Sequence, residues 1–154
     1  MIEYILVSTV KEYAEAKKLF AEYAKAINID LAFQKFDKEL EKINTMYSSP
    51  HGGIIICKKD EIFAGCIAIR KIEDTICELK RMYVNPEFQG TGIGKNLLEK
   101  ALQLAKDCNY KIIRLDTLNY MHPAIHIYKQ HGFYEIDAYY FNPNKTALFF
   151  EKQL

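Results

Sequence analysis

Residues 84–95 read VNPEFQGTGIGK and hold three of the seven glycines of the chain, at positions 90, 92 and 94. The pattern predicts that a strand ends near Val84 and that a helix begins near Gly92. Glycine lets the backbone turn tightly and brings N–H groups close to a ligand. The free N–H groups and the positive dipole end of the helix start favour an anion, and Lys95 adds a cation. The stretch therefore predicts a cradle for a phosphate or pyrophosphate, with a ligand-free turn as the alternative.

Two common phosphate-binding motifs fit this loop poorly. A Walker A loop requires G-x-x-x-x-G-K-[ST], but Gln89 occupies its first position and Asn96 its last. A dinucleotide fingerprint requires G-x-G-x-x-G, but Lys95 stands at its final position. Asp116 lies about where a ribose-binding carboxylate would fall, so dinucleotide binding stays a weaker alternative.

The rest of the chain reads as strands and helices of a single domain, residues 1–154. Thr9 and Glu12 form a capping-box pattern, which predicts an amphipathic helix that continues to Ile27. Further helices are predicted at 35–43, 92–108 and 123–131, and strands at 4–8, 54–58, 62–71, 75–84, 112–117, 133–138 and 146–151. Short polar connections predict hairpins in the first half, and a parallel strand-helix-strand crossover follows. We expect an α/β fold (α+β in some schemes) with a mixed, mostly antiparallel central sheet flanked by helices.

Composition argues against several classes of protein. The chain has 21 basic and 20 acidic residues, so no nucleic-acid partner is expected. Its apolar runs are far shorter than the roughly 20 residues of a membrane span, so no membrane partner is expected either. The N-terminus shows no secretory signal and the four cysteines form no CxxC pair, which favours a cytoplasmic location. His122 and His126 have no evident third ligand, so no metal site is expected.

Three linked segments resemble motifs of the GNAT superfamily of N-acetyltransferases. QGTGIG at 89–94 matches the Q/R-x-x-G-x-G/A loop of that family. LKRMYVNP at 79–86 is similar to its central strand and exit, and AIHIYKQHGF at 124–133 to its A-x-x-x-Y-x-x-x-G-F segment. The segments cover about residues 76–137 in the family's order and spacing. Residues 115–118 and Asn142-Pro143 resemble a small uncharacterised bacterial branch of the superfamily.

The resemblance implies a V-shaped opening between two splayed parallel strands, with acetyl-CoA wedged into it. Backbone groups of Met82 and Val84, with Tyr83 between them, would pair with the pantetheine arm. N–H groups of the glycine loop would hold the pyrophosphate: Gln89, Gly90, Thr91, Gly92, Ile93, Gly94 and Lys95. Met121 stands where the family often has asparagine, so no pantetheine contact is transferred to that position.

Tyr128 matches the family tyrosine that often protonates the departing CoA thiolate. Acetyl transfer from a thioester to an amine needs a neutral amine, a polarised carbonyl and a proton for the leaving thiolate. A tyrosine hydroxyl near the start of a helix packed on the sheet suits the role of general acid. The alternative for Tyr128 is a core aromatic that shares the buried helix face with Ala124, four residues earlier.

Glu78 lies in the middle of a half-buried strand, where a carboxylate is costly unless it is paired or functional. Its side chain is expected on the face of Met82 and Val84, unless a bulge intervenes. We hypothesise that Glu78 deprotonates the incoming ammonium through a water molecule. The alternative is an ion pair with a neighbouring cation (Arg70, Lys80 or Arg81).

The sequence thus predicts an acetyl-CoA-dependent transfer to a primary amine of a small molecule or peptide, made directly in a ternary complex. No serine or cysteine has a recognisable activating partner, which disfavours a covalent acetyl-enzyme. The second hypothesis is a non-catalytic acyl-CoA-binding module. The aromatic residues 139–141 are interpreted chiefly as cover for the core, with an acceptor pocket as the alternative. The acceptor and the oligomeric state stay open, a homodimer being one candidate.

Overall fold

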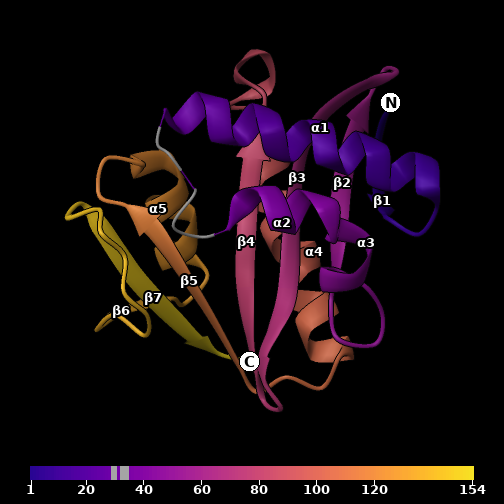
Figure 1. Cartoon of the computed structure of the whole chain (residues 1–154). Helices are drawn as coiled ribbons and strands as arrows, with labels where there is room; N and C mark the ends of the chain where they lie inside the picture. The colour runs from indigo at the N-terminus through magenta and orange to yellow at the C-terminus, as the bar shows by residue number, and fades with distance from the viewer. Residues whose placement is uncertain (29–30, 32–34) are drawn as a thin grey trace.

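The computed structural model describes residues 1–28, 31 and 35–154, and these form a seven-stranded sheet with helices on both faces (Figure 1). The strand order is β1-β2-β3-β4-β5-β7-β6. The strands are β1 (Ile2–Leu6), β2 (Gly53–Lys59), β3 (Ile62–Glu73), β4 (Ile76–Val84), β5 (Ile112–Leu118), β6 (Tyr134–Ile136) and β7 (Ala147–Gln153). The helices are α1 (Val10–Ile27), α2 (Phe36–Glu41), α3 (Ile43–Met46), α4 (Ile93–Asp107) and α5 (His122–Gln130), with a 3₁₀ turn η2 at Pro86–Phe88.

Among the described strands, β4 and β5 form the one parallel pair, and the other neighbours are antiparallel. This confirms the predicted mixed, mostly antiparallel sheet. It contradicts a dinucleotide-binding fold of the doubly wound type, which needs a mostly parallel sheet.

Helix α1 covers one face of the sheet, together with α2 and α3 (Figure 1). Its start is the predicted capping box: Thr9 Oγ1 accepts from Glu12 N–H at 3.1 Å, and Glu12 Oε1 accepts from Thr9 N–H at 3.0 Å. Leu19 and Phe20 are buried against Ile54 and neighbouring residues of the sheet. The amphipathic pattern that follows Thr9 therefore packs as predicted.

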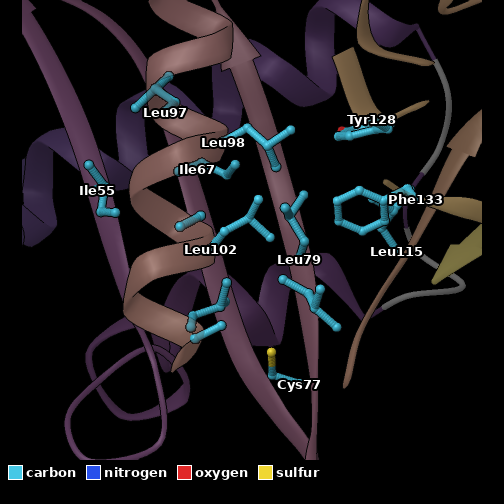
Figure 2. Close-up of a cluster of buried hydrophobic side chains, with 14 of the residues drawn as sticks. Ile55, Ile67, Cys77, Leu79, Leu97, Leu98, Leu102, Leu115, Tyr128 and Phe133 are labelled. Carbon is cyan, nitrogen blue, oxygen red and sulfur yellow. The ribbon is translucent and has the colours of Figure 1, made fainter. Parts of the chain in front are cut away.

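Helix α4 covers the opposite face, and α5 packs on the same side. The apolar positions that predicted the buried face of α4 are all buried: Ile93, Leu97, Leu98, Ala101, Leu102 and Ala105. Figure 2 shows Leu97, Leu98 and Leu102 among sheet residues such as Ile67 and Leu79. The crossover from β4 through α4 to β5 thereby fixes the end of β4 against the start of α4.

Three predicted elements differ from the structure. The strand predicted at 4–8 lies two residues earlier, at Ile2–Leu6. The helix predicted at 35–43 is two short helices, because Lys42 between them has φ −108° and ψ 20°, outside the helical region. The strand predicted at 133–138 is only Tyr134–Ile136, because this edge strand pairs with β7 alone and over three residues. None of the described helices is long and apolar enough to cross a membrane.

Candidate active site

The two parallel strands separate soon after they meet. β4 pairs with β5 only from Ile76 to Glu78, opposite Ile112 to Arg114. Beyond this point β5 continues to pair with β7 on its other side, and Figure 1 shows β4 and β5 diverging. The facing edges of residues 79–84 and 115–118 are therefore left without a strand partner within the described sheet. This confirms the V-shaped opening that the resemblance implied.

A bulge in β4 changes which side chains face the opening. Lys80 pairs with Ala68 and Tyr83 with Cys66, so β4 has one extra residue there, and Arg81 has φ +56°. As a result Lys80 and Arg81 both point toward the α1–α2 side of the sheet.

The bulge corrects the expected orientation of Glu78. Met82 and Val84 pack against the α4-side core, whereas Glu78 lines a pocket on the α2 side. The alternation along β4 predicted that all three side chains share a face. The extra residue at the bulge instead places Met82 and Val84 on the face opposite to Glu78.

The glycine loop joins β4 to α4 as predicted, with Gly90 and Gly92 in left-handed conformations at φ +78° and +86°. A Cβ added at either would meet no atom within 4 Å. Among the described residues, no hydrogen bond is observed from the N–H groups of residues 90–95. The loop therefore presents backbone donors to open space at the start of a fifteen-residue helix, which suits an anion.

Side chains brace this loop from within. Gln89 Nε2 donates to Val84 O at 3.2 Å, and Thr91 Oγ1 donates to Phe88 O. Ile93 is buried in the α4-side core, whereas Lys95 is exposed and lies 3.9 Å from Glu99. The side chains thus hold the loop's shape while the backbone faces outward.

Exchanging two of these glycines for alanine is expected to have opposite effects. Gly92→Ala should lower the free energy of unfolding by about 1 to 2 kcal/mol, because an L-residue is strained at positive φ. Gly94→Ala should raise it by up to about 1 kcal/mol, because alanine favours a helix and its methyl would make ordinary contacts with Ile127 (3.5 Å) and Val84 (3.7 Å). Urea denaturation measures both, and equal changes for the two variants would contradict the role of the left-handed turn.

A pocket of about 70 Å³ occupies the opening, here called the strand-gap pocket. It is lined by residues 79–82 of β4, residues 116–118 of β5, and Ala124 and Tyr128 of α5, with Tyr23 of α1. Tyr128 is 4% exposed, and Figure 2 shows it with Phe133 across from Leu98 and Leu79. Burial is the main cause that raises the pKa of Tyr128 well above its ordinary value, and Tyr23 and Asp116 add to it. The phenol therefore keeps its proton at neutral pH.

A second and more open pocket of about 620 Å³, here called the α2 pocket, lies between α2 and the middle of β4. Glu78 lines it and is 2% exposed. Its Oε1 accepts from Arg70 Nε at 2.9 Å and lies 3.9 Å from Lys80 Nζ, and its Oε2 accepts from Tyr139 OH at 2.6 Å. Burial raises the pKa of Glu78, but Lys80, Arg70 and the Tyr139 hydrogen bond outweigh it and leave the pKa below its ordinary value.

Glu78 and Tyr128 thus line different pockets, and Lys80 lines both. Tyr139 and Tyr140 also line the α2 pocket, and both hydroxyls donate to carboxylates. Tyr139 donates to Glu78 in the same pocket, and Tyr140 donates to Asp116, which lines the strand-gap pocket. Both rings pack on Phe149, whereas Phe141 is exposed. The aromatic cluster is therefore more than cover for the core, because two of its hydroxyls hold carboxylates, one in each pocket.

A buried ion pair connects the two pockets. The sequence suggested Arg81 as a partner of Glu78, but Glu78 pairs with Arg70 and lies near Lys80, whereas Arg81 pairs with Glu39. Arg81 Nε and Nη2 donate to the two oxygens of Glu39 at 2.9 and 2.8 Å, and both side chains are 3% exposed. The Arg81 guanidinium also lies over the rings of Tyr23 and Phe36. A charged residue in a helix is usually exposed, so no sequence pattern indicated that Glu39 is buried. Among the described residues, no group of three or more potential metal ligands is found.

The sequence of the chain matches known proteins over nearly its whole length. Residues 13–133 match the acetyltransferase (GNAT) family. An uncharacterised N-acetyltransferase of Dictyostelium discoideum is 31% identical, over 96% of this chain and 96% of its own. An uncharacterised N-acetyltransferase of Schizosaccharomyces pombe is 32% identical, over 97% of this chain and 95% of its own.

Among solved structures, the PaiA N-acetyltransferase of Thermoplasma acidophilum, in complex with coenzyme A, superposes with a TM-score of 0.75. It is 20% identical and the match covers 100% of this chain and 99% of that one, so it shows a shared fold. The family match covers well over half of the chain and includes β4, the glycine loop, α4 and Tyr128. This chain therefore belongs to the GNAT family of N-acetyltransferases.

Proposed function

We propose that this protein transfers the acetyl group of acetyl-CoA to a primary amine of a small molecule or peptide, directly and in a ternary complex. The observation that carries the proposal is the strand gap itself, with the glycine loop and its outward-facing N–H groups at one end and the buried Tyr128 beside it. A protein of the same fold was solved with coenzyme A, which supports this ligand.

Each part of the strand gap has its own role in the proposed reaction. The N–H of Gln89 already donates to Pro86 O at 3.4 Å, so the N–H groups of residues 90–95 bind the pyrophosphate. The open edge of β4 at Met82–Val84 pairs with the pantetheine arm. The amine nitrogen attacks the thioester carbonyl, a C–N bond forms and the C–S bond breaks. The Tyr128 hydroxyl then gives its proton to the departing thiolate, which leaves as free CoA.

Glu78 is proposed to accept the proton of the incoming ammonium through water. Because the pKa of Glu78 is lowered, its carboxylate is ionised at every neutral pH and can accept a proton there. Ionisation of Glu78 should therefore produce a rise in rate at acidic pH, below the ordinary pKa of a glutamate.

Glu78→Gln is expected to lower kcat by about 10- to 100-fold at neutral pH and to remove the rising limb that Glu78 contributes to the pH–rate profile. Any limb set by the ammonium of the acceptor should remain. Steady-state kinetics from pH 4 to pH 9, with thermal melting as a control for folding, provide the test. An unchanged profile, with a lower melting temperature only, would assign Glu78 to the ion pair with Arg70 instead.

The test of the function is a free-thiol release assay with acetyl-CoA and a panel of primary amines, run beside thermal melting. We expect both thiol release and stabilisation by CoA. Stabilisation by CoA without turnover on any amine would instead favour the non-catalytic binding module. No stabilisation by CoA would reject both hypotheses.

A further inference from the structure

We propose that the acceptor amine also carries an anionic group, a carboxylate or a phosphate, and that the α2 pocket binds that group. This inference rests on the proposed function and names the substrate class of the same site.

The lining of the α2 pocket has an excess of positive charge. Among its described lining residues, five are cationic and two are carboxylates. The cations are Lys35, Lys38, Lys42, Arg70 and Lys80. Both carboxylates are already engaged, Glu39 by Arg81 and Glu78 by Arg70 and Tyr139. A ligand that enters the pocket therefore meets cations whose charge the protein compensates only in part.

Three of these cations come from one short stretch of α2 and its ends. Lys38 lies within α2, and Lys35 and Lys42 are the residues at its two ends. All three line the pocket. Within the described part of the chain none of the three forms an ion pair. An anion in the pocket would therefore find these ammonium groups without displacing a carboxylate.

Arg70 adds a planar group deeper in the pocket. It uses Nε to hold Glu78 at 2.9 Å, and its side chain is 38% exposed. No hydrogen bond from its two terminal nitrogens to another described residue is observed. A guanidinium edge of this kind binds carboxylate and phosphate oxygens better than a single ammonium does.

The position of the pocket separates these cations from the phosphates of CoA. The glycine loop follows Val84 at the end of β4, whereas Arg70 pairs with Glu78 near its start. Glu78 and Val84 are six positions apart along the strand, which corresponds to about 20 Å. Lys80 lines both pockets, so the α2 pocket adjoins the strand gap on the side away from the loop. That is the side from which an acceptor can approach.

The same charges favour the chemistry. A positive environment disfavours an ammonium and so promotes the neutral amine that attacks the thioester. It also repels acceptors with a second amino group. The pocket therefore selects for amines with an anionic end and against polyamines.

The test uses amines that differ only in the charge of the far end. Butylamine, 4-aminobutyrate and 1,4-diaminobutane supply a neutral, an anionic and a cationic end, and phosphoethanolamine against ethanolamine supplies a phosphate arm. With thiol release as the readout, we expect kcat/KM for the anionic member to exceed that of its neutral partner by about tenfold or more, and the diamine to be the poorest. The two arms show whether carboxylate or phosphate is preferred.

The double variant Lys38→Gln/Lys42→Gln is expected to lower the ratio of kcat/KM for the anionic over the neutral amine by about tenfold, mainly through KM. The double variant Lys17→Gln/Lys106→Gln removes the same net charge at exposed positions outside both pockets and should keep the ratio. Dead-end inhibition by glutarate, competitive with the amine and weakened in the first double variant only, is a second readout.

Turnover of neutral or cationic amines at rates equal to those of anionic ones would overturn this inference and leave the proposed function intact. Equal ratios in the two double variants would also overturn it. Absence of thiol release with every amine would overturn the proposed function, and the acceptor class with it.

Discussion

Replacing Tyr128 with phenylalanine is expected to lower kcat by about 10²- to 10⁴-fold, the usual contribution of a positioned general acid. The change removes one oxygen from a buried ring and leaves the ring packed beside Phe133, with centroids 5.6 Å apart. The KM for acetyl-CoA should change little, because the glycine loop and the edge of β4 are untouched. Steady-state kinetics with varied acetyl-CoA separates the two parameters.

The pH profile gives a second signature of Tyr128. Because its pKa is raised above the ordinary value of tyrosine, it stays protonated through the mildly alkaline range. An acid with a raised pKa loses activity only above that pKa, so the wild-type rate should show no falling limb between about pH 7 and pH 10. A falling limb in this range that survives in Tyr128→Phe would belong to another group.

Tyr110→Phe is the matched control for Tyr128→Phe. Tyr110 is also buried, at 5% exposure, and donates to the carbonyl of His51 rather than into either pocket. Its loss should cost about 1 kcal/mol of unfolding free energy and leave kcat unchanged. If Tyr128→Phe and Tyr110→Phe reduce kcat equally, Tyr128 is a packing residue and the general acid lies elsewhere.

Local patterns in the sequence predicted the elements that build this site. The capping box at Thr9 and the apolar positions of α4 follow from short-range spacing, and the structure places them as expected. The three glycines of the loop predicted a tight turn, and the structure has that turn with Gly90 and Gly92 at positive φ. The opening between β4 and β5 came from the family resemblance, because a strand's own residues do not show where its partner departs.

The orientation of Glu78 and the pairing of Arg81 were not predictable in this way. Arg81 in the bulge has φ +56°, and no glycine or asparagine beside it in the sequence indicates such a conformation. Glu39 and Arg81 are 42 residues apart, and a pair at such a distance leaves no periodic signal. Both features depend on tertiary packing of α2 against β4, which a single sequence does not encode in local patterns.

Breaking the buried Glu39–Arg81 pair from one side is expected to destabilise the protein by about 3 to 5 kcal/mol. Glu39→Met leaves a buried guanidinium without its carboxylate, and Arg81→Met leaves a buried carboxylate without its donors, since both side chains are 3% exposed. For a domain of this size the melting temperature should fall by roughly 6 to 20 °C. Thermal melting and urea denaturation measure the loss.

The double variant Glu39→Met/Arg81→Met should recover most of that stability, because apolar residues of similar volume often replace a buried ion pair without loss. The surface pair Lys18–Glu15, at 3.2 Å, provides the control, because removing either member should cost no more than about 1 kcal/mol. If each single variant costs as little as the surface pair, the buried pair does not hold α2 on the sheet.

The double variant also separates stability from substrate binding. Helix α2 has six residues and no side-chain cap, and the pair fixes it by its buried Glu39 against the bulge of β4. Three of the lysines that line the α2 pocket belong to the same helix and its ends: Lys35, Lys38 and Lys42. If the ion pair sets their position, the double variant should regain its melting temperature and still show a raised KM for an anionic amine. If both the melting temperature and the KM return to their wild-type values, apolar packing alone positions α2, and the ion pair is not required to place the lysines.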